Sequence, residues 1–269
     1  MAKKILFVNQ EIEPYVPKNH ISTIGQELPR AAQEAGFEIR TFMPKWGNIN
    51  ERRGQLHEVI RLSGMNLVID NTDHPLIIKV ASIPVSRIQV YFIDNDDYFT
   101  KKQMYSDDSG QEYYDNGERA IFFARGVLET VKKLRWSPDL IVCQGWISAV
   151  LPLYIKTAYK DEPAFSQSKV ATILYEPQLT QNFNKNFVNS LEFKNVSNEL
   201  LKKYEQEFTP LELGKLAVDY SDGLIFGSHE IIPELAEYAN SKGLPTLPCP
   251  QEEPAKVYAD FLAKLIDNE

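Results

Sequence analysis

Three polar segments of the sequence carry residues that could bind a ligand or take part in a reaction. The first, residues 10–20, lies between a compact apolar run at residues 4–8 and a stretch with helical periodicity. Its polar and charged side chains include Glu11, Lys18, Asn19 and His20. At the amino end of a helix these groups would suit an anion or a sugar. An exposed loop whose Asn19 or Ser22 only caps the helix explains the pattern equally well.

The second segment is the acidic run Asp94-Asn95-Asp96-Asp97. Two carboxylates one residue apart at a strand end could hold a divalent cation against a nucleotide diphosphate. Asp and Asn also suit the turn by which a chain leaves a strand. Because short acidic pairs are common in loops, we favour a solvated loop and expect no metal site.

The third segment, Cys143-Gln144-Gly145-Trp146, marks the change from a strand to a helix. Gly145 permits a tight turn, and Trp146 could stack on a sugar or cover the core. Taken alone, this pattern favours core packing. The sequence has no Gly-rich phosphate loop and no nucleophile elbow, its four histidines show no paired metal spacing, and nothing points to a Ser/His/Asp triad.

The composition narrows the classes of partner and compartment. The 269 residues are 43% hydrophobic and 25% charged, with a net charge of -8. An acidic surface argues against nucleic acid or an anionic membrane, since both need clustered Lys and Arg. Cys143 and Cys249 form no disulfide framework, and no apolar run approaches the roughly 20 residues of a membrane span. The apolar start is too short for a signal peptide, so we expect a cytoplasmic protein.

Strands and helices alternate in a way that predicts an α/β fold with a doubly wound parallel, Rossmann-like sheet. The apolar run at 4–8, a helical stripe from Ile21 to Gly36 and a strand at 37–43 form its first β-loop-α-β unit. Residues 56–94 contain four short β-rich pieces and no convincing helix. This pattern indicates an inserted β-meander.

The alternation resumes after an acidic, tyrosine-rich loop at residues 94–115. The further predicted elements are a helix at 116–134, a strand at 140–143, a helix at 147–158, a strand at 169–174, a helix at 211–220, a strand at 224–226 and a helix at 229–240. We predict one domain over residues 1–243. A proline-rich connector and a C-terminal helix, residues 244–269, are expected to pack back on it through Tyr258, Phe261, Leu262 and Leu265.

A series of segments, in order along the chain, matches one known family. The segments are residues 4–8, the E-x-x-P-aromatic pattern at 11–15, Leu28-Pro29-Arg30-Ala31, Tyr91-Phe92-Ile93-Asp94-Asn95 with Tyr98, Phe99 and Tyr105, residues 115–123 (DNGERAIFF), Pro138-Asp139-Leu140-Ile141, Trp146 with Pro152-Leu153-Tyr154, and residues 220–228. Together they resemble glycosyltransferase family 5, the bacterial glycogen and starch synthases. The resemblance implies one lobe of a GT-B-type enzyme, cut off before the nucleotide-sugar domain.

The chain departs from the family at its catalytic motifs. The K-x-G-G-L loop falls on Pro17-Lys18-Asn19-His20-Ile21, where both glycines are replaced by residues with side chains and the lysine is one position late. The His and Asp of the H-D-W motif fall on Gln144 and Gly145. The motif T-I-H-N becomes Thr172-Ile173-Leu174-Tyr175. The catalytic positions that we interpret as degenerate are Gln144, Gly145, Leu174 and Tyr175.

The family transfers glucose from ADP-glucose to α-1,4-glucan, and the resemblance implies neither a cofactor nor a metal. The substrate-binding positions that it implies are Glu11, Tyr15, Lys18, Asn19, His20, Tyr91, Asp94, Asn95, Tyr105, Gln144 and Trp146. Because the motifs are degenerate, we expect a non-catalytic domain that binds α-glucan or ADP-glucose. One alternative is an active glucosyltransferase whose second domain comes from a partner chain. Another is a structural subunit that binds a true synthase at the exposed inter-lobe face.

Overall fold

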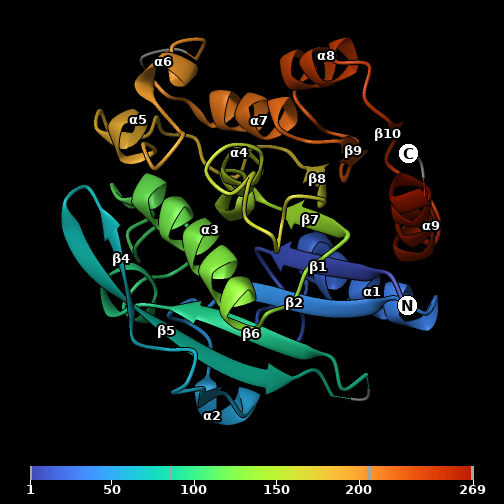
Figure 1. Cartoon of the computed structure of the whole chain (residues 1–269), viewed down its shortest axis with the longest axis horizontal. Coiled ribbons are helices and arrows are strands. Elements are labelled where there is room, and N and C mark those ends of the chain that lie inside the picture. The colour runs from blue at the N-terminus through green and yellow to red at the C-terminus, as the bar shows by residue number, and fades with distance from the viewer. Residues whose placement is uncertain (1, 85, 205–206, 268–269) are drawn as a thin grey trace.

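The computed structural model describes residues 2–84, 86–204 and 207–267, which are built around one mixed sheet (Figure 1). The strands of the described part are β1 (Lys4–Asn9), β2 (Glu38–Pro44), β3 (His57–Glu58), β4 (Met65–Ile69), β5 (Thr72–Ser82), β6 (Gln89–Asp94), β7 (Leu140–Gln144), β8 (Lys169–Leu174), β9 (Gly223–Phe226) and β10 (Thr246–Leu247). Their order is β10-β9-β8-β7-β1-β2-β6-β5-β3, and β4 pairs with β5. In this spatial order, each strand from β10 through β1 and β2 to β6 is parallel to its neighbour. Strand β5 is antiparallel to β6, and β3 and β4 are antiparallel to β5.

Helices connect the parallel strands and cover both faces of the sheet (Figure 1). The helical segments of the described part are α1 (His20–Glu34), α2 (Glu51–Gly54), the π-helix η1 (Asp96–Thr100), α3 (Asn116–Lys133), the 3-10 turn η2 (Trp146–Ser148), α4 (Leu151–Lys156), α5 (Phe187–Ser190), α6 (Asn198–Leu201), α7 (Pro210–Asp219), α8 (Pro233–Ser241) and α9 (Pro254–Asp267). The predicted helices over residues 116–134 and 211–220 therefore agree with α3 and α7 to within one residue at each end.

Alternate side chains of the central strands enter two different cores, because successive residues of a strand point to opposite faces. Leu6 and Val8 of β1 belong to the core that α3 and α4 cover. Ile5 and Phe7 belong to the core beneath α1 and α9. A parallel sheet buried on both faces is the arrangement that the alternating elements predict, and the α/β fold is confirmed.

The C-terminal helix α9 lies next to α1 on the second face of the sheet. Its buried residues Tyr258, Leu262 and Leu265 pack in the core that also contains Phe7 and Leu28. Their spacing of three and four residues places them on one stripe of the helix. Figure 1 shows both ends of the chain on this side of the molecule.

Some predicted elements differ from the structure. Strand β6, predicted as part of the inserted meander, pairs in parallel with β2, and its buried run from Val90 to Asp94 is typical of a strand covered on both faces. The strand predicted at 56–62 shortens to β3 because the chain turns after it, where the Leu62 amide donates to the Val59 carbonyl at 2.9 Å. The helix predicted at 147–158 divides into η2 and α4, whose first turn contains a proline.

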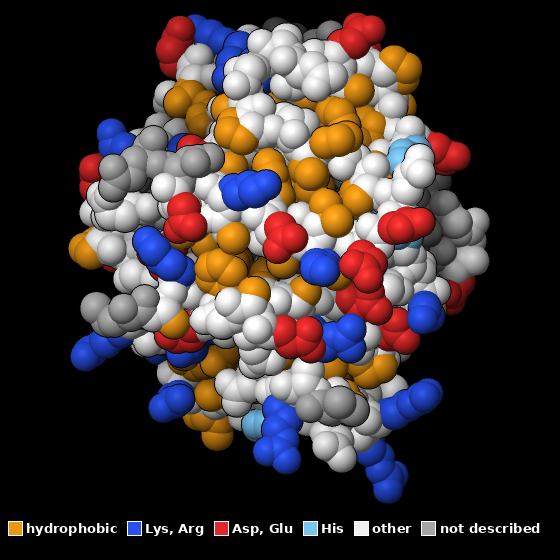
Figure 2. Space-filling model, turned by 90° about the vertical axis from the view of Figure 1, so that its right-hand side faces the viewer, with side chains coloured by type: hydrophobic (Ala, Val, Ile, Leu, Met, Phe, Trp, Pro, Cys, Tyr) orange, Lys and Arg blue, Asp and Glu red, His pale blue; other side chains and the backbone are white. Residues whose placement is uncertain are grey.

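The surface around α9 carries charges of both signs. Figure 2 shows Lys, Arg, Asp and Glu side chains interspersed over this face, while hydrophobic side chains gather in its upper part. This face therefore lacks the basic field that nucleic-acid binding requires. Among the described residues, no helix is long and apolar enough to cross a bilayer.

Candidate functional site

The candidate site lies where three neighbouring parallel strands end. Strands β8, β7 and β1 are adjacent in the sheet and point the same way, so the residues that follow them meet at one edge. Ligands of open α/β sheets bind at this carboxyl edge. The residues that reach it are Gln10 and Glu11 after β1, Gly145 and Trp146 after β7, and Tyr175 after β8.

A hydrogen-bonded group surrounds the buried carboxylate of Glu11 at the end of β1. The Gln10 amide donates to Glu11 Oε1 at 2.8 Å, and the Tyr105 hydroxyl donates to the same oxygen at 3.0 Å. Asn19 donates to the other oxygen, Oε2. Glu11 is only 2% exposed, so these donors compensate the carboxylate for the water it loses. The structure thus brings together three residues predicted from the sequence: Glu11, Asn19 and Tyr105.

A pocket opens beside this group. It has a volume of about 250 Å³. Its walls are Glu11, Pro17, Asn19, Asn48, Gln103, Met104, Tyr105 and Ser106. The walls combine amides, hydroxyls and one carboxylate with the apolar faces of Pro17 and Met104. A pocket with a few convergent polar groups suits a small polar ligand.

Gln10 connects the hydrogen-bonded group around Glu11 to the end of β7. Its side-chain oxygen accepts from the Trp146 amide at 3.1 Å, and its backbone carbonyl accepts from the Trp46 indole at 2.8 Å. Gly145 has a φ of 83°, and a Cβ there would lie 2.3 Å from Gln10 Oε1. The side chain of Gln10 therefore fills the space that a larger residue at position 145 would need.

The ends of β7 and β8 are closed by internal hydrogen bonds. The Gln144 amide donates to the Ile21 carbonyl and to the Tyr175 hydroxyl, both at 3.1 Å. Gln144 is fully buried, and burial raises the pKa of the Tyr175 hydroxyl well above its ordinary value. Leu174 is buried in the apolar core with α7 and α8. None of the four degenerate positions carries a group that exchanges a proton near neutral pH.

The first turn of α1 is held by its own side chains. Asn19 accepts from the Ser22 amide at 2.8 Å and its own amide donates to the Ser22 hydroxyl at 2.9 Å, which closes a capping box. His20 Nε2 lies 2.8 Å from the Gly227 carbonyl oxygen, which links α1 to the end of β9. Lys18 is exposed and makes no ion pair with any described residue.

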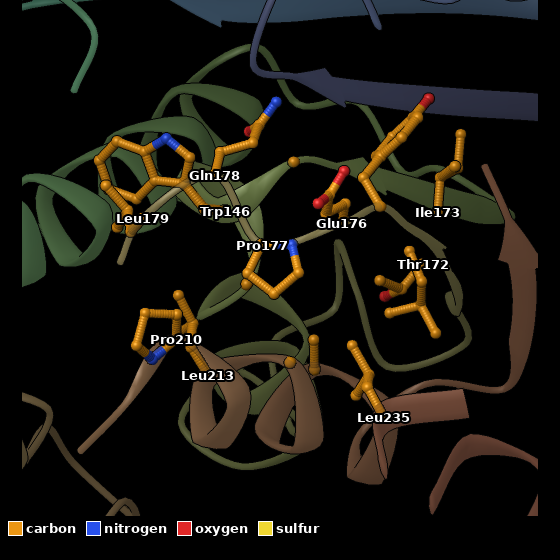
Figure 3. Close-up of a pocket in the computed structure, with 16 residues that line it drawn as sticks. Trp146, Thr172, Ile173, Glu176, Pro177, Gln178, Leu179, Pro210, Leu213 and Leu235 are labelled. Atoms are coloured by element: carbon orange, nitrogen blue, oxygen red, sulfur yellow. The ribbon is translucent and has the colours of Figure 1, made fainter. Parts of the chain in front are cut away.

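Trp146 lines a second, smaller cavity of about 60 Å³ behind the site (Figure 3). Figure 3 shows Trp146, Gln178 and Leu179 at one end and Thr172 and Leu235 at the other, with Pro177 between them. The indole is 8% exposed, and its N–H has no hydrogen-bond partner among the described residues. Trp146 thus forms part of the wall of this cavity.

Four other predicted positions lie away from this group. Tyr15 packs edge-on against Phe92 at 4.9 Å between ring centroids, and burial raises its pKa to about 12. Tyr91 stacks on Phe42 at 4.9 Å, and its hydroxyl accepts from Arg40. These two aromatic rings pack within the sheet region and do not line the pocket.

The two acidic-segment residues also have structural partners. Asp94 forms an ion pair with Lys79 at 2.9 Å and accepts from the Thr100 hydroxyl at 2.9 Å. Asn95 accepts from the Asp97 and Tyr98 amides and so caps η1. Asp96 is exposed. Within the described ranges, no three His, Cys, Asp or Glu residues lie close enough together to hold a metal ion.

Sequence reasoning missed Gln10, Trp46 and Met104. Gln10 is fully buried although it is polar, and it contacts Glu11, Tyr105, Trp146 and Met104. Its place directly after a buried strand and next to Glu11 was the available signal. Trp46 and Met104 lie in loops whose packing depends on the tertiary fold.

Comparison with known proteins places this arrangement in a family. The sequence profile described as the starch synthase catalytic domain matches residues 4–247. The chain belongs to the glycosyltransferase 5 family of starch synthase catalytic domains. The predicted resemblance is therefore confirmed.

Curated relatives and a solved structure agree with this assignment. A glycogen synthase of Chlorobium limicola is 38% identical over 173 residues, which cover 64% of this chain and 35% of that protein. A glycogen synthase of Chlorobaculum parvum is 31% identical over 228 residues, or 81% of this chain and 44% of that protein. The catalytic domain of starch synthase IV from Arabidopsis thaliana, bound to ADP and acarbose, superposes with a TM-score of 0.75 at 15% identity over 93% of this chain and 51% of that one. The chain thus spans less than half the length of the glycogen synthases it matches, and its fold is that of the GT-B type.

Proposed function

We propose that this glycosyltransferase 5 chain binds α-glucan in the pocket beside Glu11 and Tyr105 and does not transfer glucose with its own residues. One observation carries the second half of this proposal. The residues at the ends of β7 and β8 are Gln144, Gly145, Leu174 and Tyr175. The Gln144 amide donates to the Ile21 carbonyl and to the Tyr175 hydroxyl. A group that acts as acid or base needs a pKa near the working pH, and none of these has one.

The chemistry of the pocket supports a neutral sugar as the ligand. Hydroxyl groups of a sugar both donate and accept, and the pocket offers both kinds of partner from Asn48, Ser106 and Tyr105. The Glu11 carboxylate would repel a phosphate placed against it. The relatives named glycogen synthase support the same ligand class.

Calorimetric titration of the chain with maltoheptaose, ADP and ADP-glucose tests the binding half of the proposal. Replacement of Asn48 by Trp should fill the pocket without disturbing the core, because Asn48 lines the pocket and is itself exposed. We expect maltoheptaose to bind and Asn48→Trp to weaken this binding at least tenfold. If maltoheptaose binds to the wild type and to Asn48→Trp with equal affinity, the pocket is not the glucan site. Asn66→Trp, which replaces an exposed asparagine of β4 that does not line the pocket, is the matched control.

A second candidate function is glucosyl transfer from ADP-glucose with a second lobe supplied by a partner chain. Lys18 favours it. This exposed cation has no carboxylate partner among the described residues, it lies in the chain between Pro17 and Asn19, which line the pocket, and it could neutralise a diphosphate. Under this alternative, ADP-glucose would bind and Lys18→Ala would weaken its binding. Under the glucan proposal, Lys18→Ala leaves maltoheptaose binding unchanged.

A further inference from the structure

A further pocket lies at the amino edge of the sheet, where β2 and β6 begin. It has a volume of about 210 Å³. Its polar walls are Gln33, Glu38, Arg40, Arg87, Gln89 and Tyr91. Because β1, β2 and β6 run parallel, their first and last residues lie at opposite edges of the sheet. This pocket is therefore separate from the pocket beside Glu11, which follows the end of β1.

Arg40 of β2 is half-buried in this pocket, and its charge has no counter-ion among the described residues. Its guanidinium carbon lies 5.1 Å from the centroid of the Trp136 ring and 5.9 Å from that of the Tyr91 ring. One of its N–H groups donates to the Tyr91 hydroxyl at 3.1 Å, and its side chain makes no other hydrogen bond with a described residue. A guanidinium has five N–H donors. Most of the donors of Arg40 thus remain available to a ligand.

Arg87 brings a second cation to the same pocket from the turn between β5 and β6. Its amide donates to the Ile83 carbonyl at 3.0 Å, and the Ile83 amide donates to the Ile88 carbonyl at 2.8 Å. Arg87 has a φ of 56°, a conformation that Gly and Asn adopt more readily than Arg. Its side chain is exposed and makes no ion pair with a described residue. A residue held in a costly backbone conformation is typical of a functional site.

The charges of the pocket favour an anion. The whole chain has a net charge of -8, yet two arginines face one carboxylate here, that of Glu38. The Glu38 carboxylate accepts from the Trp136 indole. Arginine forms strong charge-assisted hydrogen bonds to phosphate oxygens, and one phosphate group has enough oxygens to accept from two arginines at once. The side-chain amides of Gln33 and Gln89 could donate to the remaining oxygens.

We propose that Arg40 and Arg87 bind a phosphate group at the amino edge of the sheet, as inorganic phosphate or as the phosphomonoester of a small metabolite. The volume of the pocket is below the range of most ligand sites, so it fits a phosphate with a few further atoms better than a nucleotide. The inference goes beyond the proposed function and does not rest on it, because the ligand class and the edge of the sheet both differ.

Calorimetric titration of the full chain with inorganic phosphate and, separately, with glycerol 3-phosphate tests this site. Sodium chloride of equal ionic strength is the blank. We expect saturable binding of at least one of the two phosphate compounds. The exposed position makes Arg87→Gln the safer variant, and we expect it to raise the dissociation constant about fivefold. We expect Arg40→Gln to raise it about tenfold, since Arg40 is more deeply buried.

Two further variants test whether the effect depends on the charge inside the pocket. Glu38→Gln removes the carboxylate from the wall but keeps an acceptor for the Trp136 indole, so phosphate should bind more tightly to this variant. Arg61→Gln, an exposed arginine that does not line the pocket, is the matched control and should bind phosphate like the wild type.

The outcomes separate the site from general attraction to positive charge. Tighter binding of inorganic phosphate supports a site for the free ion, and tighter binding of glycerol 3-phosphate supports a site for a phosphomonoester. If neither compound gives more heat than sodium chloride, the proposal is wrong. It is also wrong if Arg87→Gln binds phosphate like the wild type, or if Arg61→Gln weakens binding as much as Arg87→Gln does. Loss of maltoheptaose binding in Asn48→Trp with phosphate binding unchanged would support both sites.

Discussion

The end of β1 and the ends of β7 and β8 lie side by side at one edge of the sheet, yet they differ in what they leave open. At β1, Glu11 accepts hydrogen bonds from Gln10 and Tyr105, and a pocket of about 250 Å³ remains beside it. At β7 and β8, the Gln144 amide donates to the Tyr175 hydroxyl and to the Ile21 carbonyl of α1, and the cavity there has a volume of about 60 Å³. Neighbouring strand ends of one sheet can therefore differ in the space that they leave: one borders an open pocket, and the other is largely filled by its own side chains.

Gly145 is the residue at which the two regions depend on each other most strongly. Gly145→Asp would place a Cβ against the Gln10 side chain in a left-handed backbone, and we expect it to lower the free energy of unfolding by roughly 3 kcal/mol. The double variant with Gln10→Ala should recover part of this loss. Urea denaturation measures both. If Gly145→Asp is as stable as the wild type, the two strand ends are not coupled in this way.

Glu11 tests the polar side of the comparison. Glu11→Gln replaces one carboxylate oxygen with an NH₂ group. This group would face a donor in either orientation, Asn19 on one side or Gln10 and Tyr105 on the other. We therefore expect a loss of about 1–3 kcal/mol in unfolding free energy. Glucan binding should weaken as well. Glu13→Gln, whose side chain has no hydrogen-bond partner among the described residues, is the control. Equal stability of both variants would show that the carboxylate does not organise the pocket.

A substitution at Tyr175 tests the ends of β7 and β8 and should change the unfolding free energy least. Tyr175→Phe removes the acceptor of the Gln144 amide, at a cost of about 1 kcal/mol at neutral pH. Because burial raises the pKa of Tyr175 in the folded state, its hydroxyl contributes this stability below the ordinary tyrosine pKa of about 10 and loses it as the pH rises further. The stability difference between the two proteins should therefore shrink above about pH 10. A difference that does not change up to pH 11 would argue against a buried hydroxyl.

The sequence predicts most of the scaffold, because the strands and long helices follow directly from apolar periodicity. Helix α3 and strand β8 appear where their stripe and run of apolar residues place them. The short elements could not be predicted in this way. The π-helix η1 depends on Asn95 capping it through two amides, which no periodicity reveals.

The site was predictable only in part, since residue type and strand position do not give side-chain direction. Glu11 and Asn19 lie close to each other in the sequence, and the structure adds Tyr105 to them from a distant loop. Tyr91 is of a suitable type, but it lies three residues before the end of β6 and stacks on Phe42.

Incubation of the purified chain with ADP-glucose and glycogen tests the central claim most directly. The ends of β7 and β8 offer no group that exchanges a proton near neutral pH, so we expect no glucose to be incorporated by a chain that nevertheless binds the glycogen. Incorporation above the rate without protein, abolished by Lys18→Ala, would contradict the account and show that this chain takes part in glucosyl transfer.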